Sequence, residues 1–175
     1  MRGISCATIR VRPGLRSQGW LNAGTMQVPV ALGRSGVSAN KREGDGATPR
    51  GAFHPVRLWW RADRLPRPRT LLPVRRIGPA DAWCEDPGDR RYNRLFTRSA
   101  NELGDRLMRA DHLYDLVIEI DHNIRPRVAG RGSGVFIHIA RPALAPTAGC
   151  VALRPRDLLA LAQRLTSKTR IKIQN

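Results

Sequence analysis

Short runs of apolar and β-branched residues recur along this chain, and clusters of glycine and proline separate them. Runs of this length and composition predict β-strands rather than helices. Six are assigned as strands, at residues 4–12, 26–32, 53–60, 113–121, 134–140 and 169–175. The fifth is apolar at almost every position, so we expect a central strand that is buried on both faces. The last predicts an edge strand with its lysine, Lys172, directed outward.

Two segments predict short helices. Ser99 and Glu102 have the spacing of a capping box, and Leu103 and Leu107 would then share one face. A second helix is expected near the C-terminus, with Pro155 in its first turn. Its buried face would carry three leucines, Leu158, Leu161 and Leu165. The sequence therefore predicts a mainly β fold with two short helices.

Length and composition fit one folded unit. With 175 residues, 41% hydrophobic and 26% charged, the chain is expected to form a single domain over residues 1–175 and to be a monomer. No run of about 18 apolar residues is present, so no transmembrane segment is expected. Arg10 and Arg12 interrupt the N-terminal stretch before an apolar segment long enough for an export leader appears.

The charge is strongly positive. The chain has 31 Lys plus Arg against 14 Asp plus Glu, a formal net charge of +17, which predicts attraction to a polyanion. Nucleic acid, anionic lipid and a carboxylate-rich cell-wall polymer all qualify. A basic nucleic-acid-binding module is the less favoured class, because only 5% of residues are aromatic and no basic stripe interleaved with stacking residues is evident.

The three cysteines are Cys6, Cys84 and Cys150. An odd number leaves at least one free thiol in a monomer, and no Cys/His spacing indicates zinc, so we expect neither metal nor cofactor. Glu85 and Asp86 would raise the pKa of Cys84, which makes it a poor nucleophile. Cys6 is expected in the core.

Cys150 and His138 are candidates for nucleophilic catalysis, which needs a thiol, a base and donors for an oxyanion. If the strand at 134–140 delivers His138 and the following loop folds back, the two side chains meet at the strand's edge. The amides of Gly149 and Cys150 would then point into one space, and a helix starting just after Cys150 would favour the thiolate. Taken singly, a buried cysteine or histidine is more often structural.

Several separated motifs together resemble the YkuD-type L,D-transpeptidases. His138 on a strand, a loop, and then Thr147, Ala148, Gly149 and Cys150 are similar to the catalytic signature of that family. The segment "KREGDGATPRGAF" looks like the family's Thr-Pro motif before a core strand. "WCEDP", "YNR" and "HLYDLVIEIDHN" look like a branch of small proteins, so the resemblance covers about residues 24–165.

The resemblance implies a curved β-sandwich with the cysteine at a cleft, and acyl transfer on peptidoglycan stem peptides as donor and acceptor. Cys150 would be the nucleophile and His138 the proton donor and acceptor, oriented by the backbone carbonyl of Ile139. The Gly149 amide would hold the oxyanion. Cross-link formation is the expected reaction, with L,D-carboxypeptidase or D-amino-acid exchange as alternatives. The substrate implies the periplasm or cell envelope, although no leader is visible; the alternative is the cytoplasm.

The chain departs from the family pattern at two positions. Ala148 stands where a second histidine is usual, and Ala152 stands where Arg or Asn is usual. The arginines that are candidates to supply the missing charge are Arg141, Arg154 and Arg156. Further candidate substrate contacts are Thr147, His112, Tyr114, Tyr92 and Asn93. For the last four, and for Trp83 beside Cys84, a packing role is the more common alternative.

Overall fold

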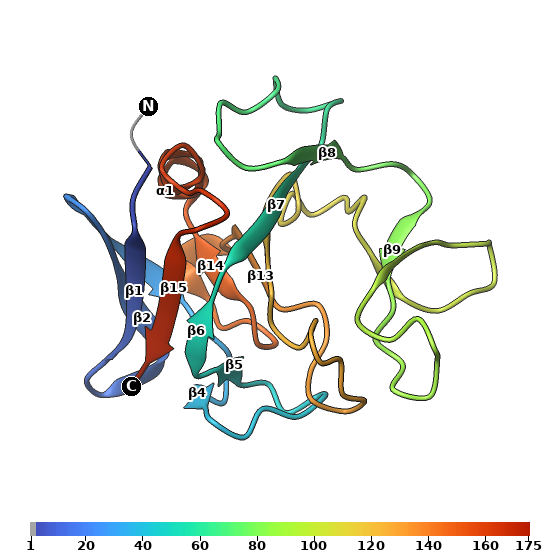
Figure 1. The fold of residues 1–175 in the computed structure, drawn as a ribbon, viewed down its shortest axis with the longest axis horizontal. Coiled ribbons are helices and arrows are strands. Elements are labelled where there is room, and N and C mark those ends of the chain that lie inside the picture. The colour runs from blue at the N-terminus through green and yellow to red at the C-terminus, as the bar shows by residue number, and fades with distance from the viewer. Residues whose placement is uncertain (1–2) are drawn as a thin grey trace.

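The computed structural model describes residues 3–175 and is built around a large curved sheet (Figure 1). Its ten strands, in spatial order, are β6 (Gly51–Phe53), β15 (Arg170–Gln174), β1 (Cys6–Arg12), β2 (Leu15–Ala23), β3 (Met26–Ala31), β14 (Val151–Leu153), β13 (Phe136–Ile139), β12 (Leu116–Ile120), β7 (Pro55–Trp60) and β8 (Val74–Arg76). The fold is therefore mainly β, as expected.

Smaller elements complete the fold. A three-stranded sheet joins β10 (Leu95–Thr97), β9 (Asp81–Trp83) and β11 (Asp105–Arg106), and β4 (Val37–Ser38) pairs with β5 (Thr48–Pro49). The helical elements are α1 (Pro155–Ala162) and the 3-10 turn η1 (Pro142–Leu144). In Figure 1 the segment around β9 forms a lobe on the right, away from β1 and β15 on the left.

The two faces of the central strands pack against different clusters. Ile118, Ile137 and Val151 join the larger core, which α1 covers with Leu158 and Leu161. The opposite face of these strands packs against the β9 lobe through a second cluster, which includes Trp59, Trp83, Leu107, Tyr114, Val117 and Phe136. Because both faces are covered, β12 is buried at every position.

The structure confirms the strand pattern in most places. Each of the six predicted runs contains a strand, although the run at 53–60 contributes the last residue of β6 and all of β7. β13 lies between β14 and β12, as a run that is apolar throughout predicts. The predicted helix at Pro155 is α1, with Leu158 and Leu161 buried and Leu165 buried just beyond its end.

The predicted helix at Ser99 is wrong. The Glu102 carboxylate accepts hydrogen bonds from both the amide and the hydroxyl of Ser99, but these bonds close a turn. Arg91 pairs with the same carboxylate, and the chain then enters β11. Leu103 is 92% exposed and Leu107 only 2%, so the two leucines share no face.

Two further expectations fail on the outer side of the sheet, and one strand was missed. β15 is not an edge strand, because the short β6 pairs with it, although Lys172 does point outward. β2 was not predicted, and one of its buried positions is Gly19, where a Cβ would lie 2.5 Å from the Arg10 carbonyl oxygen. Cys6 is half-buried on the outer face, beside the inward-facing Ala7.

The α1 face supplies a matched test of core packing. We expect Leu161→Ala to lower the free energy of unfolding by about 2–5 kcal/mol, because its side chain is fully buried and its removal leaves a cavity. Leu159→Ala on the same helix, at 40% exposure, should change it by less than about 0.5 kcal/mol. Urea unfolding followed by circular dichroism measures both, and equal losses would contradict this assignment of the buried face.

Candidate active site

Two parallel strands place the candidate catalytic side chains on one face of the sheet. β13 pairs with β14 so that His138 lies opposite Ala152. Side chains alternate along a strand, so Cys150, two residues before Ala152, faces the same side as His138. Both line one cavity of about 500 Å³ between the sheet and the β9 lobe.

The turn before β14 is held by Thr147. Its hydroxyl donates to the Cys150 carbonyl oxygen at 2.6 Å and accepts from the Gly149 amide at 3.1 Å. Gly149 has φ 145°, and a Cβ there would lie 2.9 Å from the Ala47 carbonyl oxygen, so only glycine fits. The Gly149 amide, expected to point freely into the site, is thus already bonded to Thr147.

The thiol of Cys150 is held by the backbone just before and at the start of β13. Its Sγ donates to the Gly134 carbonyl oxygen at 3.2 Å and accepts from the Phe136 amide at 3.4 Å. Gly134 is fixed in turn, because its amide donates to Asn93 Oδ1 at 3.1 Å. The same oxygen accepts from Trp83 Nε1 at 2.9 Å, so the β9 lobe positions the thiol through this chain of bonds.

His138 is oriented by its own strand. Its Nδ1 lies 2.8 Å from the Ile139 carbonyl oxygen, the contact that the resemblance implies. A carbonyl only accepts, so Nδ1 carries the hydrogen and Nε2 carries the free lone pair. The Tyr114 ring packs edge-on against the imidazole with centroids 5.3 Å apart, and its hydroxyl donates to Asp105 at 2.8 Å.

Burial keeps both groups neutral. It raises the pKa of the Cys150 thiol to about 12, with further increases from Asp105 and Glu85. It also lowers the pKa of His138 to about 4, against the opposing effect of the Ile139 carbonyl. The expected help from a helix N-terminus is absent at this site, because β14 separates Cys150 from α1. The resting pair is therefore thiol and imidazole.

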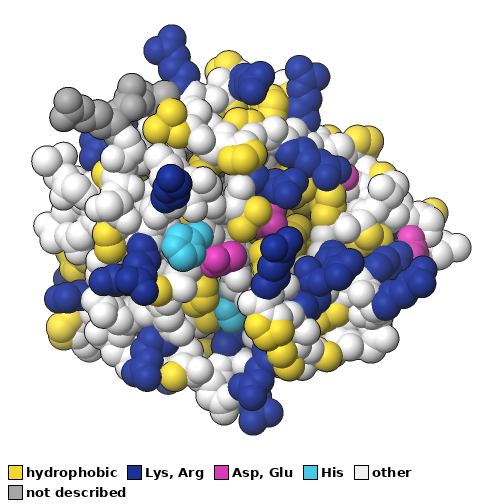
Figure 2. Space-filling model, viewed as in Figure 1, with side chains coloured by type: hydrophobic (Ala, Val, Ile, Leu, Met, Phe, Trp, Pro, Cys, Tyr) yellow, Lys and Arg dark blue, Asp and Glu magenta, His cyan; other side chains and the backbone are white. Residues whose placement is uncertain are grey.

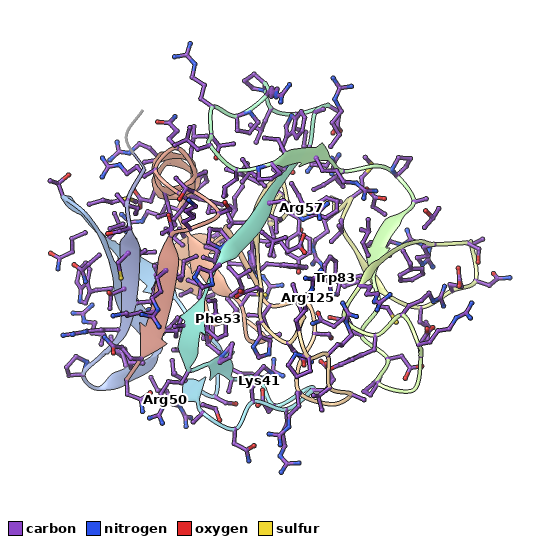
Figure 3. The ribbon with its side chains drawn as sticks, in the orientation of Figure 1. Lys41, Arg50, Phe53, Arg57, Trp83 and Arg125 are labelled. Atoms are coloured by element: carbon purple, nitrogen blue, oxygen red, sulfur yellow. The ribbon has the colours of Figure 1, made fainter. Side chains whose placement is uncertain are left out.

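The cavity wall carries charges of both signs. The carboxylates are Glu43, Glu85 and Asp105, and the cations are Arg34, Lys41, Arg109 and Arg141. Asp105 pairs with Arg109 at 3.1 Å, and Lys41 pairs with Asp45 in the connection between β4 and β5. In Figure 3, Lys41 lies below and to the left of Trp83, the residue of β9 that pairs with Asp105 of β11.

The predicted substrate contacts divide into two groups. Thr147, Tyr114 and Arg141 line the cavity. The other four lie outside its lining. His112 is exposed and bound to Asp115, and Arg154 precedes α1 at the surface. Tyr92 donates its buried hydroxyl to Glu43, and Asn93 is buried among backbone groups. Tyr92 and Asn93 therefore support the site from behind it.

The two departures from the family pattern occupy different surroundings. Ala148 is exposed at the cavity wall. Ala152 is 1% exposed and packs with Ala31 and Leu144. A long side chain at 152 would displace Leu144, so the small residue lets the short loop after β13 close onto the sheet. Of the three candidate arginines, Arg141 alone lines the cavity.

Several cavity residues were missed from the sequence. Arg34, Lys41 and Glu43 come from the connection between β3 and β5, and Asp105 and Arg109 come from the segment of the wrongly predicted helix. Each is an ordinary charged residue in its local context. The resemblance to the Thr-Pro segment was the one signal: Thr48 accepts from the Gly33 amide and donates to the Cys150 carbonyl oxygen.

The other cysteines do not compete at this site. All three thiols are free. Cys84 is buried in a separate cluster with Ala82 and Phe96, and burial raises its pKa. Among residues 3–175, no group of three or more His, Cys, Asp or Glu side chains has the arrangement of a metal site. No helix in the same residues is both long and apolar enough to cross a membrane.

The comparisons with known proteins bear on this geometry. No curated protein matches the chain. Among solved structures, the chain is similar to one titled "Structure of Bdellovibrio bacteriovorus Bd1075", with a TM-score of 0.47 and 14% sequence identity. The match covers 98% of this chain and 48% of the other, so this chain spans about half that length.

A family model completes these findings. The model of the YkuD family, described as the L,D-transpeptidase catalytic domain, matches residues 15–173. The match extends beyond residues 24–165, where the motifs were found, and takes in β2 and nearly all of β15. This chain therefore belongs to the YkuD family of L,D-transpeptidase catalytic domains.

Proposed function

We propose that Cys150 and His138 catalyse acyl transfer between peptidoglycan stem peptides. The observation that carries the proposal is that both side chains line one cavity while the Ile139 carbonyl leaves His138 Nε2 free to accept a proton. Membership of the YkuD family supports peptidoglycan as the substrate class. A peptidoglycan substrate in turn implies that the enzyme acts in the cell envelope. The reaction needs no metal in this scheme.

The first step begins from a neutral pair. The thiol leaves the Gly134 carbonyl oxygen and gives its proton to His138 Nε2 as Sγ attacks the carbonyl carbon of the donor stem. The attacking group is not a preformed thiolate, because burial disfavours both a charged Cys150 thiolate and a charged His138 imidazolium before the substrate binds. The proton transfer and the attack are therefore coupled.

The oxyanion is stabilised by backbone donors at the turn. The Cys150 amide is the first of these, and the Gly149 amide contributes only by releasing the Thr147 hydroxyl. Collapse of the intermediate breaks the peptide bond, and Nε2–H protonates the departing amine. A thioester on Cys150 remains.

The second step decides the product. Attack on the thioester by an amine of a neighbouring stem forms a cross-link, and His138 takes the proton that the amine loses. Water in place of the amine gives a carboxypeptidase, and a free D-amino acid gives exchange. Analysis of the muropeptides formed from purified sacculi separates these products.

Arg141 contributes to substrate binding in this proposal. Its guanidinium lies at the cavity wall on the loop after β13, and stem peptides carry free carboxylates that guanidinium groups bind in pairs of hydrogen bonds. In this proposal Arg141 supplies the positive charge that the family usually carries at position 152. The small Ala152 lets the loop that bears Arg141 pack against the sheet.

We expect a carbapenem to acylate Cys150, because members of this family react with carbapenems through their cysteine. Intact-mass spectrometry should show one adduct on the wild type and none on Cys150→Ala. Cys84→Ala is the matched control and should keep the adduct, since Cys84 lies in a separate buried cluster. Labelling of Cys150→Ala to the wild-type level would overturn the assignment of the nucleophile.

A neutral resting pair predicts a particular pH dependence. In a Cys6→Ser, Cys84→Ser background, the rate of Cys150 alkylation by iodoacetamide should keep rising from about pH 6 to about pH 10, because the thiolate fraction grows until the thiol pKa of about 12. A rate that is flat over this range would indicate a thiolate paired with imidazolium instead.

His138 should affect the two reactions differently. His138→Ala is expected to slow carbapenem acylation by roughly 10²- to 10⁴-fold, because the base is lost, and to change alkylation by less than about threefold. Wild-type acylation should fall as the pH drops through about 4, where the imidazole becomes protonated and can no longer accept the thiol proton. Stopped-flow fluorescence measures the acylation rate.

The two exposed arginines near the site provide a matched pair. Arg141→Gln should raise KM for a soluble tetrapeptide stem about threefold to tenfold with little change in kcat, because a carboxylate contact is lost. Arg154→Gln, outside the cavity lining, should leave both constants unchanged. Equal effects of the two substitutions would argue that overall charge matters rather than this contact.

A further inference from the structure

Acidic side chains are absent from both ends of the sequence. Residues 1–42 and 158–175 contain no Asp or Glu, while they carry seven and four Lys or Arg residues, respectively. All fourteen acidic residues fall between these two segments, where the catalytic cavity takes its carboxylates. These two segments therefore carry +11 of the formal net charge of +17, and two of their cations, Arg34 and Lys41, line the candidate cavity.

These two segments meet in one part of the sheet. β15 pairs with β1, and β1 pairs with β2, so the N-terminal and C-terminal strands lie side by side. In register, Lys172 lies between Thr8 and Ala52, and Arg10 lies between Gln174 and Trp20. Figure 2 shows blue side chains and no magenta over the left part of this view, where β1 and β15 lie in Figure 1.

The outward side chains of these strands form what we call the basic sheet face. Its cations share exposure to solvent and the absence of an ion-pair partner among residues 3–175; they are Arg10, Arg12, Arg50, Arg170 and Lys172. The inward side chains of the same strands, such as Ile9, Ile171 and Ile173, are in the core. The face is thus fixed by the alternation of the sheet.

The basic sheet face is hollowed at one end. Arg50, Arg170 and Lys172 line an open depression of about 520 Å³ over β6 and β15, and Figure 3 shows Arg50 just before β6. Like charges brought together without counter-charges repel one another, which costs stability unless an anion relieves it. Guanidinium groups in such a depression suit carboxylates, which they bind with two parallel hydrogen bonds.

We propose that the basic sheet face binds the peptidoglycan polymer at a second, non-catalytic site, through free carboxylates of stem peptides that are not reacting. The identity of the polymer rests on the proposed function. The basic sheet face lies on and beside β6, β15 and β1, whereas the proposed catalytic pair lies on β13 and just before β14. A peptidoglycan chain bound to this face therefore leaves the cavity open to another stem peptide.

Other polyanions fit this face less well. Trp20, at 38% exposure, is the one aromatic side chain exposed on it, and the Arg12 guanidinium lies over its ring at 6.0 Å. Proteins that bind single-stranded nucleic acid typically present several stacking aromatics, and amphipathic elements that bind a membrane surface bury apolar side chains among the lipids. Repeated carboxylates on a polymer need only the spaced cations that the strands provide.

The test is co-sedimentation of the whole chain with purified sacculi at several salt concentrations. Arg10→Gln/Lys172→Gln should weaken binding roughly threefold to tenfold at about 0.1 M salt, and the difference should shrink as salt rises. The matched control is Arg67→Gln/Arg69→Gln, which removes the same charge from exposed residues in the loop between β7 and β8. It should bind within about twofold of the wild type.

Acylation of soluble donor stem should be the same in both double variants and the wild type, and Cys150→Ala should still sediment. Equal loss in the two double variants, or unchanged binding in the first, would overturn the proposal. So would tighter binding to phosphatidylglycerol vesicles or to DNA than to sacculi at equal salt. If the wild-type protein binds sacculi but catalyses no acyl transfer, that result would count against the proposed function alone.

Discussion

The parallel pairing of β13 with β14 is the constraint on which the rest of the site depends. It sets His138 opposite Ala152 and so brings Cys150 to the same face of the sheet. A shift of one residue in this register would turn either side chain into the core that Ile137 and Val151 fill. The large core behind these strands therefore stabilises the geometry of the candidate site as well as the fold.

The same pairing explains why the side chains of the candidate pair, Cys150 and His138, are neutral. Strands buried on both faces place any polar side chain in a poorly solvated space, and the β9 lobe completes that space over β13 through Trp83 and Phe136. Burial then disfavours both the thiolate and the imidazolium. The hydrogen bonds from Cys150 to Gly134 and from His138 to Ile139 satisfy the two neutral groups.

How much of this the sequence could predict depends on how local each feature is. The apolar run at β13, the leucines of α1 and the Cys, His and Gly signature are local and were found. The capping box at Ser99 was a local signal too, but pairing of β11 with β9 and the contact of Arg91 with Glu102 override it. Tertiary pairing of this kind leaves no trace in a short window of sequence.

The cavity charges show the same limit at longer range. Arg34, Asp105 and Cys150 meet from segments that are far apart in the chain, and no spacing rule links them. The position of β15 inside the sheet likewise depends on β6, which ends more than a hundred residues earlier. Such features follow from topology, which single strands do not specify.

The replacement of an expected arginine by Ala152 shows how a loop and a strand position change together. Ala152 leaves room for Leu144, and Leu144 secures the short turn η1 against Ala31. That turn begins directly after Arg141, whose side chain then lies at the cavity wall. A guanidinium on the loop is more exposed than one on β14 would be, because Arg141 is exposed and position 152 is only 1% exposed. Specificity for the substrate would then depend on the conformation of this loop as much as on the residues of the sheet.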